Sequence, residues 1–196
     1  MLGQGRARQP GELAVAERKL GVILHGVTGR MGDVAHRALK DIVARGGVAA
    51  GGDTVVPVPI GLGRDASKLA DYARASGLAE CCTSLGDALR RAKAINPQFQ
   101  VYHNAVAAGA LLAALLAALP ELDPSTTGVF CEKPIAANYR EGWEVVEALE
   151  RRRFVHGVVH DMLQTPGFRK AIEWLPAIQP LFCQMAFGYE VGDGKS

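Results

Sequence analysis

A glutamate, a lysine and a proline follow one another at positions 132–134, directly after an apolar run, in the stretch VFCEKPIAAN. Proline fixes its own φ and disfavours a helical backbone at the residue before it, so we expect Lys133 on a stiff, non-helical segment whose Lys133–Pro134 bond can be cis. An ammonium group held in this way can stabilise negative charge that develops on an oxygen during a reaction. The alternative is a surface ion pair beside a turn, and the spacing alone does not separate the two.

A second candidate site is the glycine-rich stretch HGVTGRMG, which follows an apolar run and precedes a helical pattern. Glycines at such a turn let the backbone approach a pyrophosphate, and the free N–H groups and dipole of the helix N-terminus favour phosphate. The G-x-x-G-x-x-G spacing differs from the usual fingerprint, and a plain glycine-rich turn is the alternative. We favour a dinucleotide-binding loop formed by Gly26, Thr28, Gly29, Arg30, Met31 and Gly32.

The end of the second expected strand bears on which dinucleotide would bind. NAD-binding domains usually place Asp or Glu there to accept hydrogen bonds from the ribose hydroxyls, whereas a 2′-phosphate repels a carboxylate and favours an arginine. In PIGLGRDASK no acid stands at the strand end, Arg64 follows it, and Asp65 is placed to cap the next helix. We therefore expect NADP in preference to NAD, with an ordinary surface arginine as the alternative.

The elements that must position these residues alternate along the chain. Apolar runs predict strands over 20–26, 54–61, 79–82, 99–104, 126–132 and 154–161. Helical patterns lie between them: Val34, Ala38 and Ile42 are at helical spacing in the first, Asp65 and Gly77 bound the second, and Thr83 or Ser84 caps the third. An alanine–leucine helix follows over 105–119, and Asn138 with Glu141 resembles a capping box for a last helix ending near Arg152.

Strands separated by helices require crossover connections, so the fold class is α/β, a doubly wound and mainly parallel sheet over residues 19–160. Functional residues should follow the strands, at the carboxyl edge of the sheet. Residues 1–18 form an N-terminal extension. Residues 161–196 hold one expected helix, LQTPGFRKAIEWL, and one expected strand, LFCQMAFGYEV, which we interpret as the incomplete start of a second domain. A strand with open edges can pair subunits, so a homo-oligomer is possible through it.

The totals exclude several classes of partner. A net charge of +2 in 196 residues, without clustered basic and aromatic residues, argues against nucleic acid. No apolar stretch is long enough for a membrane span, and no export signal is visible. Cysteines at 81, 82, 131 and 183 match no zinc or disulfide framework, so we expect reduced thiols, no metal site and a cytoplasmic protein. Cys81 and Cys82 should point to opposite faces of an extended segment.

The glycine loop after the first strand, together with CEKPIAAN after the fifth, resembles the Gfo/Idh/MocA family of NAD(P)-dependent oxidoreductases, whose hallmark is the E-K-P tripeptide. The resemblance covers about residues 19–191 and implies a Rossmann domain followed by an α/β domain that covers the active site and commonly pairs subunits. It implies that Lys133 contacts substrate and nicotinamide and that Glu132 lies near the nicotinamide ribose. Asp161 and Gln164 would border the substrate crevice, the alternatives being a helix cap and a surface residue.

Two features depart from the family pattern. Family members usually place a Thr-Pro or similar pair and a downstream histidine after the fourth strand, whereas this chain reads VYHNAVAAGALLAALL, where His103 and Asn104 are our candidate cofactor contacts. The family's acid/base pair, an aspartate and a histidine, would lie beyond Ser196. The leading hypothesis is hydride transfer between nicotinamide and a sugar- or polyol-like substrate, with Lys133 polarising the oxygen. The alternatives are a non-catalytic dinucleotide-binding or interaction module and, further behind, a relative of dihydrodipicolinate reductase, whose glycine loop is similar.

Overall fold

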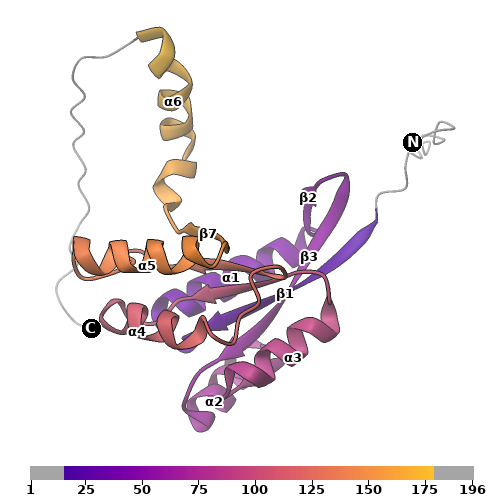
Figure 1. Ribbon diagram of the computed structural model, residues 1–196. Helices are drawn as coiled ribbons and strands as arrows, with labels where there is room; N and C mark the ends of the chain where they lie inside the picture. The colour runs from indigo at the N-terminus through magenta and orange to yellow at the C-terminus, as the bar shows by residue number, and fades with distance from the viewer. Residues whose placement is uncertain (1–15, 179–196) are drawn as a thin grey trace, which may run out of the picture. The chain divides into compact units, whose positions relative to one another are not determined.

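The computed structural model describes residues 16–178 of the chain, which divides into two units. The first unit runs to Val159 and contains all the strands of Figure 1, while the second begins at His160.

The first unit is built on a seven-stranded sheet with the order β2-β3-β1-β5-β6-β7, in which β4 also pairs with β3. All pairs are parallel except β2 with β3. From β1 the chain adds β3 on one side and later β5 on the other, so the order of strand addition reverses between β1 and β5, as in a doubly wound Rossmann sheet. The expected fold class is therefore confirmed. The strands are β1 (Glu17–His25), β2 (Val48–Ala50), β3 (Asp53–Leu62), β4 (Glu80–Cys82), β5 (Gln100–Asn104), β6 (Thr127–Cys131) and β7 (Val155–Val158).

The sequence analysis did not predict the short edge strand β2. It forms a hairpin with β3 through Gly51 and Gly52, which have φ of 59° and 88°. A two-glycine loop is a recognised hairpin signal because glycine adopts positive φ without steric cost, so this strand could have been found.

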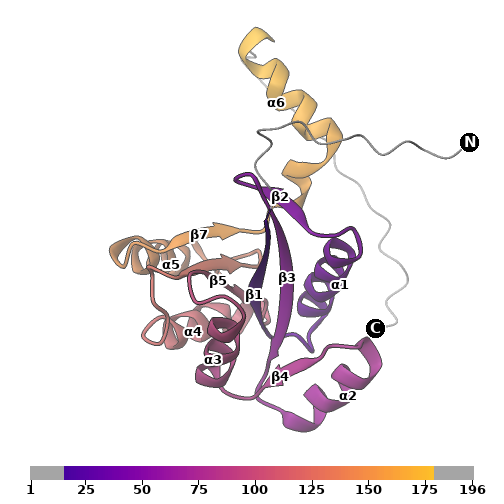
Figure 2. The same ribbon diagram turned by 90° about the vertical axis from the view of Figure 1, so that its right-hand side faces the viewer.

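Five helices of the first unit cover the two faces of the sheet. Figure 2 shows α1 and α2 on one side and α3, α4 and α5 on the other. Their N-terminal caps are mostly those expected: the side chains of Asp65, Ser84 and Asn138 each accept a hydrogen bond from the backbone N–H three residues later. The helices are α1 (Arg30–Ala44), α2 (Ala66–Ser76), α3 (Leu85–Ile95), α4 (Ala108–Ala118) and α5 (Tyr139–Arg151).

Two hydrophobic clusters, one on each face, hold these layers together. Ile23 of β1 points into the cluster beneath α3, α4 and α5, whereas Val22 and Leu24 point into the cluster beneath α1 and α2. Cys82 and Cys81 divide in the same way, which confirms that they face opposite sides of the sheet. Each fully buried Leu or Ile stabilises the fold by about 1.5–3 kcal/mol relative to an exposed one.

Helix α1 packs on the sheet through Ala35 and Leu39, beside Gly32 and His36, and not through the expected face of Val34 and Ala38. Gly32 and His36 are buried, while Val34 and Ala38 are exposed. Gly32 lets α1 approach the preceding turn closely, and His36 can be buried because its ring is hydrogen-bonded to the Tyr72 hydroxyl.

The second unit contains the 3₁₀ turn η1 (Asp161–Gln164) and the helix α6 (Pro166–Ile178). The single helix expected from Leu163 is therefore wrong at its start. Proline disfavours helical geometry at the residue before it and is favourable at the first helical position, so the α-helix begins at Pro166. The expected strand at 181–191 and nearly all of the extension 1–18 lie outside the described residues.

Candidate functional site

The glycine loop joins β1 to α1 through contacts between backbone atoms. Gly26 has φ of +87°, and a Cβ at this position would lie 3.0 Å from the carbonyl oxygen of Ala105 and the nitrogen of Val106. A Cβ on Gly32 would lie 2.3 Å from the carbonyl oxygen of Gly26. Side chains at these two positions would force apart the turn, the first turn of α1 and the segment after β5.

The residues between these glycines divide into a buried anchor and an exposed rim. Val27 is fully buried in the cluster beneath α1 and α2, whereas Thr28, Gly29 and Arg30 are exposed and Met31 is half-buried. Val27 therefore anchors the loop and leaves its outer surface to solvent or a ligand.

The start of α1 offers backbone donors beside this loop. Gly29 is the N-cap and has no capping side chain, and the amide of Asp33 donates to its carbonyl oxygen at 2.9 Å. The N–H groups of Arg30, Met31 and Gly32 precede that bond, so they belong to the helix end that has no intrahelical acceptor. Such donors, with the positive end of the helix dipole, fit a phosphate group.

A cleft of about 410 Å³ lies at the switch point between β1 and β5. It is lined by His25, Gly26, Thr28 and Gly29, by Gly63 and Arg64 after β3, and by the alanine-rich start of α4. No acidic side chain lines it within the described part of the chain, and Arg64 is its charged residue. The cleft is thus electrostatically suited to an anionic ligand.

Asp65, the acid nearest the end of β3, is occupied as a helix cap. Its Oδ1 accepts a hydrogen bond of 3.0 Å from the amide of Lys68 at the start of α2. Gly63, which follows the last residue of β3, has no side chain, and Asp65 does not line the cleft. No carboxylate therefore reaches the cleft from the end of this strand.

The E-K-P stretch begins where β6 ends and splits into a buried and an exposed part. Glu132 is 5% exposed, and its amide donates to the carbonyl oxygen of Asn104 at 2.9 Å. Lys133 is exposed, and the Lys133–Pro134 peptide bond is cis, one of the two possibilities raised by the sequence. The lysine is therefore presented to solvent beside a glutamate that is held inside.

The buried partner of Glu132 is His103, at the end of β5. The His103 Nε2 atom lies 3.4 Å from Glu132 Oε1, and the His103 ring packs against Phe130 with centroids 5.4 Å apart. Burial lowers the pKa of His103 to about 4, so the imidazole is neutral near pH 7. The next residue, Asn104, is fully buried and donates from Nδ2 to the carbonyl oxygen of Leu111 at 2.9 Å, which ties β5 to α4.

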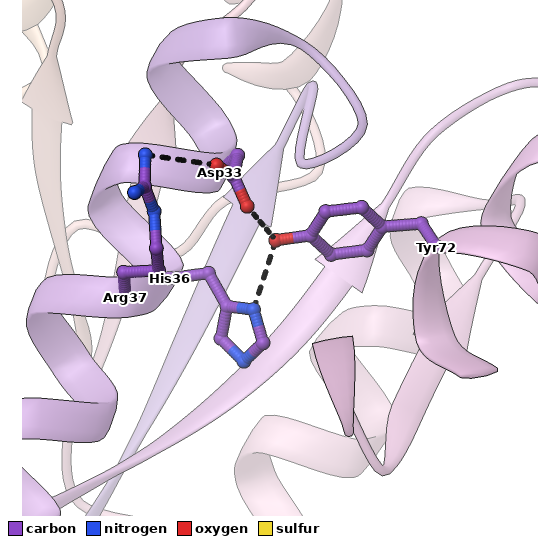
Figure 3. A network of polar contacts seen from close by, with 4 residues as sticks. All are labelled: Asp33, His36, Arg37 and Tyr72. Carbon is purple, nitrogen blue, oxygen red and sulfur yellow. Dashed lines mark hydrogen bonds and ion pairs between the residues drawn. The ribbon is translucent and has the colours of Figure 1, made fainter. Parts of the chain in front are cut away.

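A polar network that the sequence analysis missed connects α1 to α2 (Figure 3). The Tyr72 hydroxyl donates to Asp33 Oδ1 at 3.0 Å and lies 2.9 Å from Nδ1 of the buried His36. Since the hydroxyl proton goes to Asp33, we infer that His36 Nδ1–H donates to the tyrosine oxygen. Arg37 pairs with the other oxygen of Asp33 at 3.0 Å. Burial, followed by the bond to Asp33, raises the pKa of Tyr72 to about 12.

This network, which we call the α1–α2 brace (Asp33, His36, Arg37 and Tyr72), fixes two candidate binding elements relative to each other. Asp33 lies in the first turn of α1, next to the glycine loop, and α2 follows directly after Arg64. Its partners are 36 and 39 residues apart, which is why no local pattern reveals it.

The remaining predicted residues lie in the second unit. Asp161 and Gln164 are the first and last residues of η1, and both are exposed. In the range 16–178, no three His, Cys, Asp or Glu side chains are grouped so that they could hold a metal ion. In the same range, no helix has the length and apolar character needed to cross a bilayer.

Comparisons with known proteins give one curated relative and several similar structures. D-xylose dehydrogenase from Paenarthrobacter nicotinovorans is 31% identical over 152 residues, which are 76% of this chain and 37% of that protein. Levoglucosan dehydrogenase in its apo form is 22% identical, with a TM-score of 0.61 over 82% of this chain and 38% of that one. No family model matches the chain.

A second similar structure contains a cofactor. The WlbA dehydrogenase from Chromobacterium violaceum, in complex with NADH and UDP-GlcNAcA, is 18% identical, with a TM-score of 0.59 over 82% of this chain and 40% of that one. The chain spans less than half the length of each of these three proteins. The structural likenesses show the shared fold.

The α1–α2 brace predicts a stability loss in Tyr72→Phe. The substitution removes the hydroxyl from Asp33 and leaves buried His36 Nδ1 without its acceptor, so the free energy of unfolding should fall by about 1–3 kcal/mol. Urea denaturation measures this. Tyr139→Phe is the matched control, since Tyr139 is 84% exposed and should change stability by less than about 0.5 kcal/mol. Equal values for the two variants would show that the brace does not stabilise the fold.

The depressed pKa of His103 predicts a stability loss in acid. Below about pH 6.5 the unfolded chain takes up a proton at this histidine that the folded chain accepts only near pH 4. The free energy of unfolding should therefore fall as the pH drops through this window, by up to about 3 kcal/mol from this group.

Denaturation of His103→Gln at pH 7.5 and pH 5 checks the acid effect, because this variant should lose less stability between the two values than the wild type does. His156→Gln, at an exposed position of β7, serves as control and should keep the wild-type dependence. An unchanged dependence in His103→Gln would assign the acid sensitivity to other groups.

Proposed function

We propose that the chain is a member of the Gfo/Idh/MocA family through its Rossmann domain and that it binds a nicotinamide dinucleotide in the cleft between β1 and β5. The single observation that carries this proposal is the glycine loop, where backbone approaches so closely that a Cβ on Gly32 has no space. The exposed rim of the loop and the first amides of α1 would hold the pyrophosphate. The relatives are named as dehydrogenases, which supports the same proposal.

The lining of the cleft supports NADP as the preferred cofactor. Arg64 is the charged residue of the lining, Gly63 stands at the strand end, and Asp65 caps α2. A 2′-phosphate would meet a guanidinium and no carboxylate there, and arginine suits phosphate because its planar group donates two parallel hydrogen bonds. NAD would forgo that contact. Arg64 is therefore the residue that we propose sets the cofactor preference.

The E-K-P stretch supplies the groups for chemistry in this proposal. Lys133 is exposed at the carboxyl edge of the sheet, where its ammonium can donate to a substrate oxygen and stabilise negative charge on it. Glu132, buried beside His103, would contact the nicotinamide ribose, and we propose His103 and Asn104 at the end of β5 as further cofactor contacts. When bound, the nicotinamide supplies the hydride acceptor or donor.

The substrate that we propose is a sugar or polyol. The named relatives act on or bind xylose, levoglucosan and a nucleotide sugar according to their names, and all are dehydrogenases. Asp161 and Gln164 are the residues of the second unit that we propose contact this substrate. We also propose that subunits pair through the segment at 181–191.

Isothermal titration calorimetry of the 196-residue protein with NADPH and NADH tests the cofactor preference. Wild-type protein should bind NADPH about tenfold or more tightly than NADH, since a charge-assisted hydrogen bond contributes about 1.5–3 kcal/mol. Arg64→Ala should bring the two dissociation constants together, mainly by weakening NADPH. Arg74→Ala, at the exposed far end of α2, is the control and should retain the wild-type ratio. An unchanged ratio of the two dissociation constants in Arg64→Ala would exclude Arg64 as the residue that selects NADPH. Absence of binding heat with both cofactors would overturn the binding proposal.

Turnover tests the role of Lys133. Wild-type protein with NADP should oxidise at least one member of a panel of sugars and polyols, followed at the absorbance of reduced nicotinamide. Lys133→Ala should lower kcat at least a hundredfold while changing the NADPH dissociation constant less than about threefold, because the ammonium acts mainly on the reacting oxygen. Lys93→Ala on the exposed side of α3 should behave as the wild type. If the wild-type protein and Lys133→Ala both bind NADPH and neither oxidises any member of the panel, the result would instead favour a non-catalytic dinucleotide-binding module.

A further inference from the structure

We propose that His25 is an additional cofactor contact whose Nε2–H donates to a phosphate or ribose oxygen of the dinucleotide, and that Tyr102 fixes the proton on that nitrogen. The inference rests on the proposed dinucleotide site and adds a side-chain donor to its backbone donors. His25 is the last residue of β1, directly before Gly26, and its side chain lines the cleft with Thr28 and Arg64.

One ring nitrogen of His25 is already engaged. Its Nδ1 atom lies 2.6 Å from the hydroxyl oxygen of Tyr102, with the ring centroids 5.8 Å apart. Tyr102 lies in the middle of β5, two residues before the position that pairs with His25, and it is fully buried. The contact therefore joins the two strands that flank the switch point.

The direction of this hydrogen bond follows from the burial of Tyr102. Within residues 16–178, the Tyr102 hydroxyl is hydrogen-bonded to His25. A buried hydroxyl whose hydrogen has no acceptor lowers the stability of the fold. Burial also raises the pKa of Tyr102, so the hydroxyl keeps its proton. The hydroxyl thus donates to Nδ1, and Nδ1 accepts.

Acceptance at Nδ1 determines the rest of the ring. Burial lowers the pKa of His25, which favours the neutral imidazole, and a neutral ring that accepts at Nδ1 carries its hydrogen on Nε2. Nε2–H is then a donor available on the ring of a cleft-lining residue.

The cleft provides the setting in which such a donor has a use. Its described lining contains a guanidinium, a threonine hydroxyl and glycine backbone, but no carboxylate that would otherwise take the hydrogen bond. An oxygen-rich anion placed against the glycine loop would therefore meet the Nε2–H of His25 next to the amides of α1. Dinucleotide oxygens are the acceptors of this kind that the proposed function brings there.

Nitrogen-15 NMR of the histidine side chains tests the first half of the inference without any cofactor. In the free protein at pH 7.5, His25 should show the Nε2–H tautomer as the dominant form. Tyr102→Phe, which removes the donor to Nδ1, should turn this into a mixture of tautomers. A dominant Nδ1–H tautomer in the wild-type protein would overturn the inference by itself.

Titration with NADPH tests the second half. The Nε2 resonance of His25 should shift on binding, and His25→Leu should weaken NADPH about tenfold, whereas His25→Gln, which keeps an N–H donor on a side chain of similar length, should weaken it less than about threefold. The exposed His156→Leu is the control and should bind as the wild type does. A circular dichroism melt of each variant separates loss of binding from loss of fold.

The outcomes separate this inference from the proposed function. NADPH that binds without shifting the Nε2 resonance and with equal affinity to His25→Leu would overturn the role of His25 and leave the dinucleotide site intact. Absence of any NADPH binding to wild-type protein would overturn the dinucleotide site, and the role of His25 with it.

Discussion

The close approach of three backbone segments at the end of β1 is the constraint on which the candidate site depends. The turn at Gly26, the first turn of α1 at Gly32 and the segment after β5 at Ala105 lie so near one another that a side chain at either glycine would separate them. Because the segments are close, the N-terminus of α1 lies at the switch point between β1 and β5. The backbone donors of the helix, the cleft and the ends of β5 and β6 are thus brought to one edge of the sheet.

Buried polar pairs then fix what that edge presents. His103 beside Glu132, Tyr102 beside His25 and the α1–α2 brace each place a polar group inside the fold with a partner. Acidic groups are kept from the cleft, since Asp65 caps α2 and Asp33 is paired with Tyr72 and Arg37. Arg64, Thr28 and Lys133 are exposed, while Asp65, although exposed, is engaged at the N-terminus of α2 and does not line the cleft. This distribution of charge is the physical basis for proposing an anionic cofactor.

The sequence alone predicted the parts of this arrangement that local chemistry controls. Apolar runs located the longer strands, and glycine, Asx and serine caps located helix ends. The glycine loop and the E-K-P stretch lie directly after strands, at the carboxyl edge of the sheet, as expected. The alternation of strands and helices was sufficient for the fold class, because parallel strands need crossovers. The hairpin at Gly51 and Gly52 was missed although its signal is local.

The rest depends on pairs distant in sequence. His25 and Tyr102 are 77 residues apart, and His36 and Tyr72 are 36 apart, so no spacing rule connects them. The burial of His36 in α1 was hidden for the same reason, since the hydroxyl that pairs with this polar side chain belongs to Tyr72, 36 residues away. The packing of Asn104 against Leu111 likewise shows that a residue chosen as a cofactor contact also ties β5 to α4.

The most direct test of the account is amide hydrogen exchange of the 196-residue protein with and without NADPH. If the pyrophosphate binds at the glycine loop, the amides of Arg30, Met31 and Gly32 should exchange at least tenfold more slowly with NADPH, while the amides of the β2–β3 hairpin should keep their rates. Saturable binding of NADPH that leaves those three amides unchanged would contradict the account, because the dinucleotide would then occupy another part of the protein.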